Sequence, residues 1–316
     1  MAEKSGQLQN RAKELHFMLC CLFVRFGCKL RNGFSDYQQY INLEISTTAF
    51  KAIFIDLDGT LLRRDHTISS ATKDLIENLI AKKILVVLVS ARPIHGITPI
   101  SALLKTSALP VASLNGAYIV MGDMVIFQSS MDLEKVNSIH TFSKEFDVTL
   151  LYYTGLKWYS ETNNAAVAKE QRITEVKVTV EQFPALLNAW KQETVGINKV
   201  MAIGKESVIK QFQSKLVSIF GNELNIYTSK PTYLEMMHAN ASKTNAMKFL
   251  LKRYDIAREE AIALGDNYND KEMIMYAGTG VAMGNAPDEI KAVADYVTDT
   301  NQNDGVRKAL EKFIRT

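Results

Sequence analysis

The chain has 316 residues, of which 47% are apolar and 22% are charged, and its formal net charge is +3. A chain of this length and composition is expected to fold as a globular protein with two domains. Because lysine and arginine are scattered and the net charge is close to zero, neither nucleic acid nor an anionic membrane is expected as a partner.

The first 49 residues are expected to form an N-terminal extension whose role the sequence does not reveal. They hold all three cysteines, Cys20, Cys21 and Cys28, whose spacing fits neither a zinc site nor a disulfide framework. Such a chain suits a reducing compartment, so the expected location is the cytoplasm. The apolar stretch 15–24 is shorter than the roughly 20 residues that a membrane-spanning helix needs, and no stable membrane association is expected.

From residue 50 onward, short apolar runs that are typical of buried strands alternate with helical patterns. The predicted strands are 52–55, 84–90, 110–116, 260–266 and 280–283. The predicted helices are 70–81, 97–104 and one that begins at Lys243. This alternation predicts an α/β fold with a doubly wound, Rossmann-like parallel sheet over residues 50–131 and 239–316.

Between residues 132 and 238 the strand-like runs are polar on one side. These runs are 149–154, 157–160, 199–203, 224–228 and 232–236, and helical patterns at 133–146, 181–193 and 206–219 separate them. Strands of this kind are typical of an antiparallel sheet with helices on one face. An α+β domain inserted into the α/β core is therefore predicted. Its polar candidates for contacting a substrate are Asn163, Asn164 and Lys199.

Two aspartates, Asp56 and Asp58, follow the first predicted strand in the stretch FIDLDGTLL. Unpaired carboxylates near a buried strand cost several kcal/mol of desolvation free energy unless cations or hydrogen-bond donors meet them. Residues two apart in an extended segment project to one side, so both carboxylates are expected to address one substrate. The stretch therefore predicts a cation or a ligand at the end of this strand.

Polar side chains also follow other predicted strands or begin a neighbouring helix: Ser90, Lys243, Asp266, Asn269 and Asp270. In open α/β sheets, ligands bind beyond the carboxyl ends of the strands. These side chains are therefore expected to converge with Asp56 and Asp58. Carboxylates from two strand ends form a hard oxygen site, which suits Mg²⁺.

Such a set of groups indicates phosphoryl transfer. Mg²⁺, Lys243, the Ser90 hydroxyl and the backbone N–H groups of the turn 58–60 would neutralise the phosphoryl oxygens. Asp56 would then be free to attack phosphorus, as other aspartate nucleophiles do.

Four stretches, DLDGTLL, VSARP, ASK before a helix and GDNYND, resemble in this order the four motifs of the haloacid dehalogenase-like (HAD) phosphatase superfamily. The predicted insertion lies between the second and third of them. Together with SLNGA before it, YLEM at its end and GVAMGNA after the last motif, this placement is similar to the Cof-like, type IIB subfamily. The resemblance covers residues 50–316 and implies a HAD core with an inserted cap of the C2 type.

The resemblance also implies a role for each residue at a motif position. Asp56 would be the nucleophile that becomes phosphorylated, and Asp58 the acid/base that protonates the leaving group and then activates water. Ser90 would donate a hydrogen bond to the phosphate, and Lys243 would balance its charge. The implied Mg²⁺ ligands are the Asp56 side chain, the Asp58 carbonyl and Asp266, with Asp270 as a further residue of the metal site.

Substrate-binding candidates surround these groups: Gly59, Thr60, Ala91, Arg92, Asn115 and Asn269. Two departures from the family pattern stand out. The second motif reads Ser90-Ala91-Arg92 where Thr-Gly-Arg is more frequent, a change that keeps the hydroxyl. The stretch MMHAN replaces the usual Pro-Lys-Gly before the third motif.

The expected function is a Mg²⁺-dependent phosphatase that acts on a small phosphorylated metabolite, such as a sugar phosphate or a phosphorylated cofactor. Two alternatives stay open: a phosphomutase of the same fold, and a non-catalytic regulatory protein that binds a phosphorylated metabolite. A dehalogenase fits less well, because Asp58 offers an acid that a halide leaving group does not need. Neither the physiological substrate nor the oligomeric state can be read from the sequence.

Overall fold

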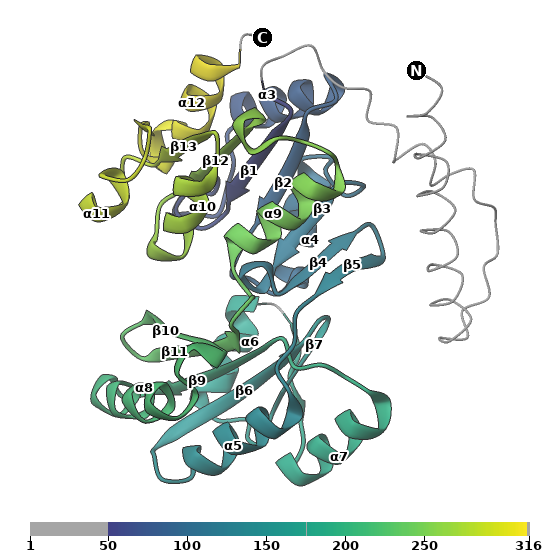
Figure 1. Cartoon of the computed structure of the whole chain (residues 1–316), viewed down its shortest axis with the longest axis vertical. Helices are drawn as coiled ribbons and strands as arrows, with labels where there is room; N and C mark the ends of the chain where they lie inside the picture. The colour runs from purple at the N-terminus through teal and green to yellow at the C-terminus, as the bar shows by residue number, and fades with distance from the viewer. Residues whose placement is uncertain (1–49, 175, 315–316) are drawn as a thin grey trace, which may run out of the picture. The chain divides into compact units, whose positions relative to one another are not determined.

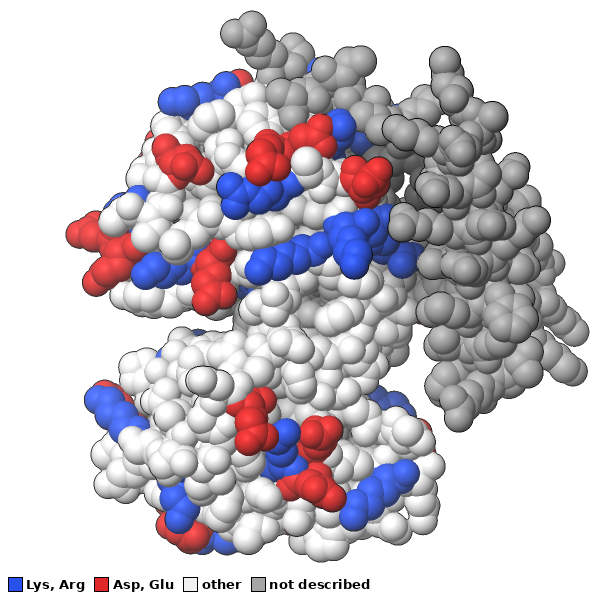
Figure 2. Space-filling view, in the orientation of Figure 1, with Lys and Arg blue, Asp and Glu red and all other residues white. Residues whose placement is uncertain are grey.

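The computed structural model describes residues 50–174 and 176–314, and the predictions for the N-terminal extension and its cysteines lie outside these residues. The described residues contain an 8-stranded and a 6-stranded β-sheet (Figure 1). No helix in this part of the chain is long and apolar enough to cross a membrane. On the face drawn in Figure 2, basic and acidic side chains are interspersed.

The 8-stranded sheet has the strand order β14-β13-β12-β1-β2-β3-β4-β5. Its strands are β1 (Ala52–Asp56), β2 (Leu85–Val89), β3 (Pro110–Ser113), β4 (Tyr118–Met121), β5 (Met124–Gln128), β12 (Ala261–Gly265), β13 (Thr279–Ala282) and β14 (Tyr296–Val297). Neighbouring strands from β14 to β3 pair in parallel, whereas β4 and β5 are antiparallel. The sequence analysis missed this hairpin.

Helices cover both faces of this sheet: α3 (Ser70–Ala81), α4 (Thr98–Leu103), α9 (Lys243–Arg253), α10 (Lys271–Tyr276), α11 (Asp288–Lys291) and α12 (Gly305–Phe313). Successive side chains of a strand point to opposite faces. Ile53 and Ile55 of β1 accordingly belong to the cluster that contains α3 and α12 residues, while Phe54 belongs to the cluster with α9 and α10. Because both faces are covered, every residue of β1 and β2 is buried.

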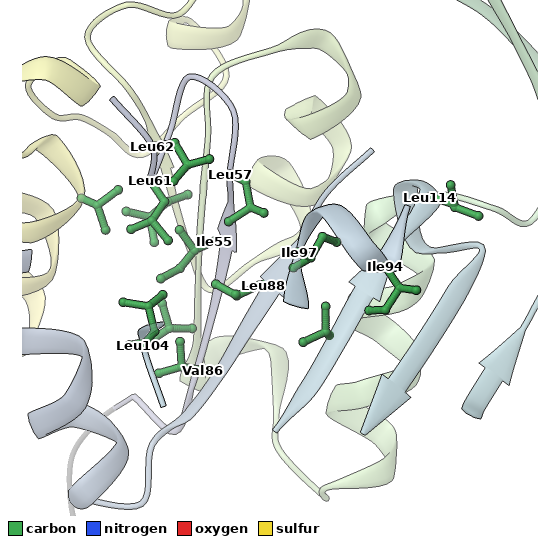
Figure 3. Packing of buried hydrophobic residues seen from close by; sticks show 14 of the residues in the cluster. Ile55, Leu57, Leu61, Leu62, Val86, Leu88, Ile94, Ile97, Leu104 and Leu114 are labelled. Atoms are coloured by element: carbon green, nitrogen blue, oxygen red, sulfur yellow. The ribbon is translucent and has the colours of Figure 1, made fainter. Parts of the chain in front are cut away.

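The loop after β1 continues the hydrophobic core. Leu57 and Leu61 are buried in the same cluster as Ile55 of β1 and Leu88 of β2 (Figure 3). Burying an aliphatic side chain of this size contributes about 1.5–3 kcal/mol. These apolar anchors on either side of Asp58 hold the loop in place at the edge of the sheet.

The 6-stranded sheet has the order β10-β11-β9-β6-β7-β8. Its strands are β6 (Val148–Thr154), β7 (Lys157–Ser160), β8 (Thr179–Val180), β9 (Lys199–Gly204), β10 (Leu224–Lys230) and β11 (Tyr233–His238). Its pairs are antiparallel except for β7 with β8. The helices that accompany it are α5 (Leu133–Ser143), α6 (Ala165–Thr174), α7 (Phe183–Glu193) and α8 (Glu206–Phe220).

The two faces of the 6-stranded sheet pack into different clusters. Tyr152 of β6 and Val200 of β9 share a core with residues of α5, α7 and α8. Tyr153 and Met201, the next residues along each strand, belong instead to the cluster that contains Val167 of α6. Tyr153 is buried.

The predicted fold class is confirmed: a doubly wound α/β core carries an inserted α+β unit, which consists of the 6-stranded sheet and its helices. Predicted strands 157–160 and 199–203 match β7 and β9 closely. Helix α6 was missed, because the apolar residues of its sequence AAVAKEQRIT form one run and a single later isoleucine, which gives no clear helical period. The domain limits 50–131, 132–238 and 239–316 stay a prediction.

Candidate functional site

The carboxyl ends of three adjacent parallel strands meet at one edge of the 8-stranded sheet. β1 lies between β2 and β12 and pairs with both in parallel. Asp56 is the last residue of β1, Ser90 follows β2 and Asp266 follows β12. Segments of the chain that are far apart in sequence therefore place their polar side chains together, as predicted.

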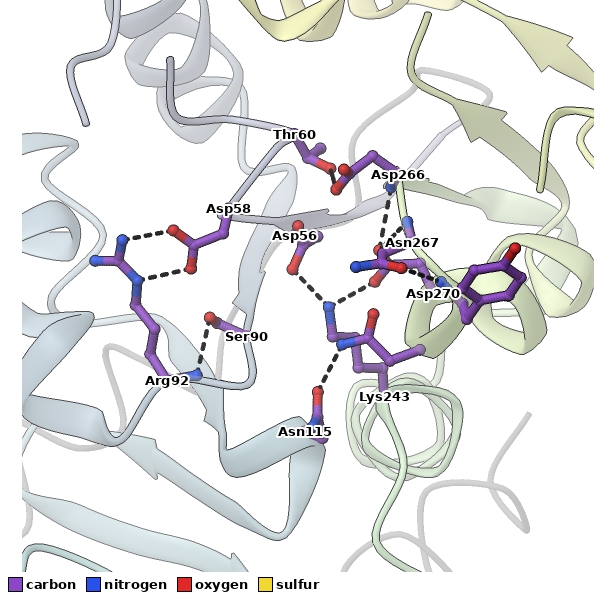
Figure 4. Close-up of polar contacts among 12 residues, drawn as sticks. Asp56, Asp58, Thr60, Ser90, Arg92, Asn115, Lys243, Asp266, Asn267 and Asp270 are labelled. Atoms are coloured by element: carbon purple, nitrogen blue, oxygen red, sulfur yellow. Dashed lines mark hydrogen bonds and ion pairs between the residues drawn. The ribbon is translucent and has the colours of Figure 1, made fainter. Parts of the chain in front are cut away.

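Lys243 is the cation at the centre of this arrangement. Ser242 is the N-cap of α9 and its hydroxyl accepts a hydrogen bond from the backbone N–H of Asn245, so the helix begins at Lys243. The Lys243 ammonium donates to Asp56 Oδ1 and Asp270 Oδ1, each at 2.5 Å (Figure 4). Burial lowers the pKa of Lys243, but the two carboxylates outweigh it and raise this pKa above its ordinary value. Lys243 therefore stays charged.

Three carboxylates gather around one position. Ligand oxygens of Asp56, Asp266 and Asp270 all lie within 4.8 Å of one another. Burial, and then the charge of Asp270, raise the pKa of Asp56 well above its ordinary value. Burial, and then the same neighbour, raise the pKa of Asp266 to about 6. Such mutual repulsion is what a bound divalent cation relieves, so the three groups fit a hard metal ion such as Mg²⁺.

Hydrogen bonds hold Asp266 and Asp270 in place. Asp270 Oδ2 accepts hydrogen bonds from the backbone N–H groups of Asp266 and Asn267, at 3.1 and 3.0 Å. Asp266 Oδ1 accepts one from the Thr60 hydroxyl at 3.0 Å. Thr60 was predicted to bind substrate, but in the structure its hydroxyl contacts this carboxylate.

Gly59 gives Asp266 its space. Its φ of +87° lies in the region that glycine adopts readily, and an added Cβ would lie 2.2 Å from Asp266 Oδ2. The Gly59 carbonyl accepts a hydrogen bond of 2.8 Å from Asn285, which also donates to Asp266 Oδ2 at 3.3 Å. The sequence analysis missed Asn285, although it lies in the quoted stretch GVAMGNA.

Asp58 and Asp56 contact different cations. Arg92 donates from Nε and Nη2 to the two carboxylate oxygens of Asp58, at 2.7 and 2.6 Å (Figure 4). Asp56 contacts Lys243 instead. The expectation that both side chains project to one side relied on an extended backbone, but β1 ends at Asp56 and the chain then turns. That both carboxylates address one substrate stays a prediction.

The loop after β2 carries Ser90, Ala91 and Arg92. Ser90 is buried, and its hydroxyl oxygen accepts a hydrogen bond from the backbone N–H of Arg92 at 3.1 Å. Its carbonyl accepts another from the backbone N–H of Asn115 at 2.8 Å. Asn115 has a φ of 52°, a left-handed backbone conformation that asparagine tolerates in turns. These bonds bring two predicted substrate-binding residues, Arg92 and Asn115, next to Ser90.

Asn115 connects the two sheets. Its side-chain oxygen accepts a hydrogen bond from Asn269 at 3.0 Å, and its nitrogen donates to the hydroxyl of Tyr227 on β10. The sequence analysis did not identify Tyr227, because a residue 112 positions away in an alternating strand carries no local signal. The predicted roles of the site residues in binding and catalysis stay predictions.

The polar candidates of the insertion have structural partners. Lys199 is buried and pairs with Glu235 at 3.3 Å. Asn164 accepts hydrogen bonds from the backbone N–H groups of residues 166 and 167, at the start of α6. Asn163 accepts a hydrogen bond from Gln171 at 3.3 Å.

Known proteins of similar sequence match almost the whole described chain. A family model of haloacid dehalogenase-like hydrolases matches residues 53–310. A protein from Haemophilus influenzae with a provisional phosphatase name is 35% identical over 266 residues, which cover 83% of this chain and 98% of that protein. A Bacillus subtilis 5-amino-6-(5-phospho-D-ribitylamino)uracil phosphatase is 29% identical over 266 residues, covering 84% and 96% of the two chains.

Solved structures give the same result. A haloacid dehalogenase-like hydrolase from Bacteroides thetaiotaomicron has a TM-score of 0.75 and 30% identity, covering 83% of this chain and 99% of that one. A sugar phosphatase of HAD subclass IIB has a TM-score of 0.72 and 25% identity, covering 83% and 98%. The chain therefore belongs to the haloacid dehalogenase-like hydrolases, and within them it is a Cof-like, type IIB phosphoric monoester hydrolase.

Proposed function

We propose that this phosphatase depends on Mg²⁺ and hydrolyses small phosphorylated metabolites, sugar phosphates or phosphorylated cofactors, through an aspartyl-phosphate on Asp56. The main observation in support is the acidic cluster: ligand oxygens of Asp56, Asp266 and Asp270 all lie within 4.8 Å of one another. The buried Lys243 ammonium donates hydrogen bonds to two of these residues, Asp56 and Asp270. A site with three carboxylates and one fixed cation favours binding a metal ion together with an anionic substrate.

Two similar proteins support the substrate class. One is named for a phosphoribitylamino-uracil and the other is described as a sugar phosphatase. A small phosphorylated metabolite is the substrate class these names share. We keep the cytoplasm as the proposed location.

In the proposed first step, an Asp56 carboxylate oxygen attacks phosphorus while the bond from phosphorus to the substrate oxygen breaks. Asp58 donates its proton to that leaving oxygen. In the second step Asp58 takes a proton from water, the water oxygen attacks phosphorus, and the bond between Asp56 and phosphorus breaks to release inorganic phosphate. Ser90 and Lys243 hold the phosphoryl oxygens in both steps.

The contacts of Asp58 add one requirement to this scheme. Arg92 donates to both oxygens of its carboxylate, so neither oxygen is free to carry a proton to a substrate in this conformation. Asp58 therefore has to leave Arg92 before it can carry the proton to the leaving oxygen. The Asp58 side chain is half-exposed, so it has room to turn.

A bound Mg²⁺ would neutralise charge on the phosphoryl oxygens. Asp56, Asp266 and Asp270 would hold it through their side chains, and Asp58 through its carbonyl. The test is a phosphate-release screen over a broad panel of phosphorylated metabolites, with Mg²⁺ and with a chelator. Metal-dependent release from sugar phosphates supports the proposal. Isomerised product in place of free phosphate favours a phosphomutase. Phosphate release at an equal rate with Mg²⁺ and with the chelator overturns the metal requirement.

A further inference from the structure

Glu235 is a buried carboxylate in the 6-stranded sheet, away from the acidic cluster. It lies on β11 with only 4% of its surface exposed. Its Oε2 accepts hydrogen bonds from Lys199 Nζ at 3.3 Å and from the Tyr227 hydroxyl at 3.1 Å. A buried ion pair of this kind is weak evidence for stability, because desolvation of both charges offsets their attraction. Its contacts therefore call for another explanation.

One chain of hydrogen bonds leads from Glu235 into the phosphoryl-transfer site. Tyr227 donates to Glu235 and accepts from the side-chain nitrogen of Asn115. Asn115 in turn accepts from the side-chain nitrogen of Asn269. Asn269 directly precedes Asp270, whose carboxylate contacts Lys243 (Figure 4). Three hydrogen bonds thus connect a carboxylate of the insertion with Asn269, the neighbour in sequence of Asp270.

The direction of this chain is fixed at the Glu235 end. The Tyr227 hydroxyl donates to Glu235 Oε2, which also accepts a hydrogen bond from the Lys199 ammonium, so the hydroxyl proton of Tyr227 points to Glu235. The Tyr227 oxygen is then an acceptor, and Asn115 has to offer its nitrogen to it. The Asn115 oxygen is left for Asn269, which also has to offer its nitrogen. Each amide therefore has one orientation, and the Asn269 oxygen takes no part in this chain.

Burial, and then the charge of Glu235, raise the pKa of Tyr227 well above its ordinary value. The tyrosine therefore keeps the proton that sets the direction of the chain.

A second connection from the same carboxylate reaches the other side of the site. Lys199 contacts Glu235 and also donates a long hydrogen bond of 3.5 Å to the carbonyl of Ala91. Ala91 lies between Ser90 and Arg92. The ammonium also lies 4.7 Å from the ring centre of Tyr153, which holds it further in place. Both connections from Glu235 thus end at loops of the 8-stranded sheet.

We propose that Glu235 is a positioning residue which, through Tyr227, fixes the side-chain amides of Asn115 and Asn269 for phosphoryl transfer. The proposal rests on the proposed function for its kinetic consequence, but the amide orientation is a property of the protein alone. Tyr227 transmits the effect and contacts neither the metal cluster nor Lys243 in the structure.

The matched pair of variants is Tyr227→Phe and Tyr233→Phe. Tyr233 lies on the neighbouring strand and donates a 2.7 Å hydrogen bond to another buried carboxylate, Glu170. Each variant removes one hydroxyl that is bonded to a buried carboxylate, but only Tyr227 leads to Asn115. With an aryl phosphate and Mg²⁺, Tyr227→Phe is expected to lower kcat about tenfold with little change in KM. Tyr233→Phe is expected to leave both close to the wild-type values.

A double variant separates positioning from general destabilisation. If Tyr227 acts through Asn115, then Tyr227→Phe has no further effect on kcat in an Asn115→Ala background. Multiplicative losses in the double variant overturn the proposal. So does an equal fall of kcat in the Tyr227→Phe and Tyr233→Phe variants.

The side-chain amide signals of the asparagines provide a readout that needs no activity. In a nitrogen–proton NMR spectrum, the Asn115 and Asn269 signals are identified by their loss in Asn115→Ala and Asn269→Ala. Tyr227→Phe is expected to shift both, and Tyr233→Phe neither. Unchanged signals in Tyr227→Phe overturn the proposal. If the wild type releases no phosphate from any substrate, the proposed function fails, while these signals still decide the orientation of the amides.

Discussion

The ammonium of Lys243 lies 2.5 Å from Asp56 Oδ1, in a site where both side chains are almost completely buried. The lysine begins α9 and the aspartate ends β1, 187 residues apart in the chain. Burial and the two neighbouring carboxylates raise the pKa of Asp56, and the Lys243 ammonium opposes that rise. The predictions below test this arrangement.

The first prediction concerns the proposed nucleophile. Asp56→Asn is expected to abolish phosphate release, because an amide oxygen is too weak a nucleophile for phosphorus. Thermal unfolding should show no loss of stability, since the change removes a buried charge whose raised pKa reports poor solvation. The matched control is Asp65→Asn, an exposed aspartate whose carboxylate accepts hydrogen bonds from Thr67. Full activity of Asp56→Asn would overturn the assignment.

The second prediction concerns the cation. Lys243→Met leaves Asp56 and Asp270 buried without it, and breaking a buried ion pair costs about 3–5 kcal/mol of unfolding free energy. We expect a large fall of the melting temperature and a partial recovery when Mg²⁺ is added. Lys252→Met, at an exposed position in the last turn of the same helix, serves as the control. An unchanged melting temperature in Lys243→Met would show that the pair does not form.

The third prediction uses two glycines with positive φ. Gly59→Ala places a methyl group 2.2 Å from Asp266 Oδ2, so that this side chain has to move. Affinity for a divalent cation, measured by calorimetry, is expected to fall about tenfold or more. Gly122→Ala carries a similar backbone strain at φ +58° with no atom within 4 Å of the new Cβ. Equal effects of the two changes on metal affinity would contradict the account.

The fourth prediction concerns pH. Burial, and then Asp270, raise the pKa of Asp266 to about 6, and a metal ligand has to be deprotonated to bind. Metal affinity should therefore fall as the pH drops through about 6, and binding should release protons.

The same raised pKa makes the metal-free protein less stable as the pH rises. A raised pKa in the folded state means that the contribution of Asp266 to stability is complete below its ordinary pKa of 3.8 and is lost as the pH rises through about 6. Added Mg²⁺ should therefore raise the melting temperature more at about pH 7.5 than at about pH 5. A metal effect that is equal at both pH values would contradict this prediction.

The parts of the site that the sequence predicted well are those with a local signal. β1 and its Asp56 follow from an apolar run that ends in a carboxylate, and the start of α9 at Lys243 follows from a helical pattern. The convergence of Asp266 on Asp56 follows from the rule that ligands bind at the carboxyl ends of parallel strands.

The contacts between the two sheets could not be predicted in this way. Lys199 was a polar candidate for contacting a substrate, and its partner Glu235, which lies 36 residues away on a neighbouring strand, could not be foreseen. The Arg92 contact of Asp58 depends on the turn after β1, which the strand alternation cannot describe. To predict which distant polar side chains pair, one has to know the register of the strands in each sheet.

The contact of Tyr227 with Asn115 limits how freely the insertion can be exchanged. Transplanting a foreign cap between residues 131 and 239 would leave the strands and the aspartates of the recipient intact, yet it would remove the phenol to which Asn115 donates. A chimaera made without a replacement acceptor at that position should fold but hydrolyse its substrate slowly. Restoring one suitably placed hydroxyl would then be the first step in repairing it.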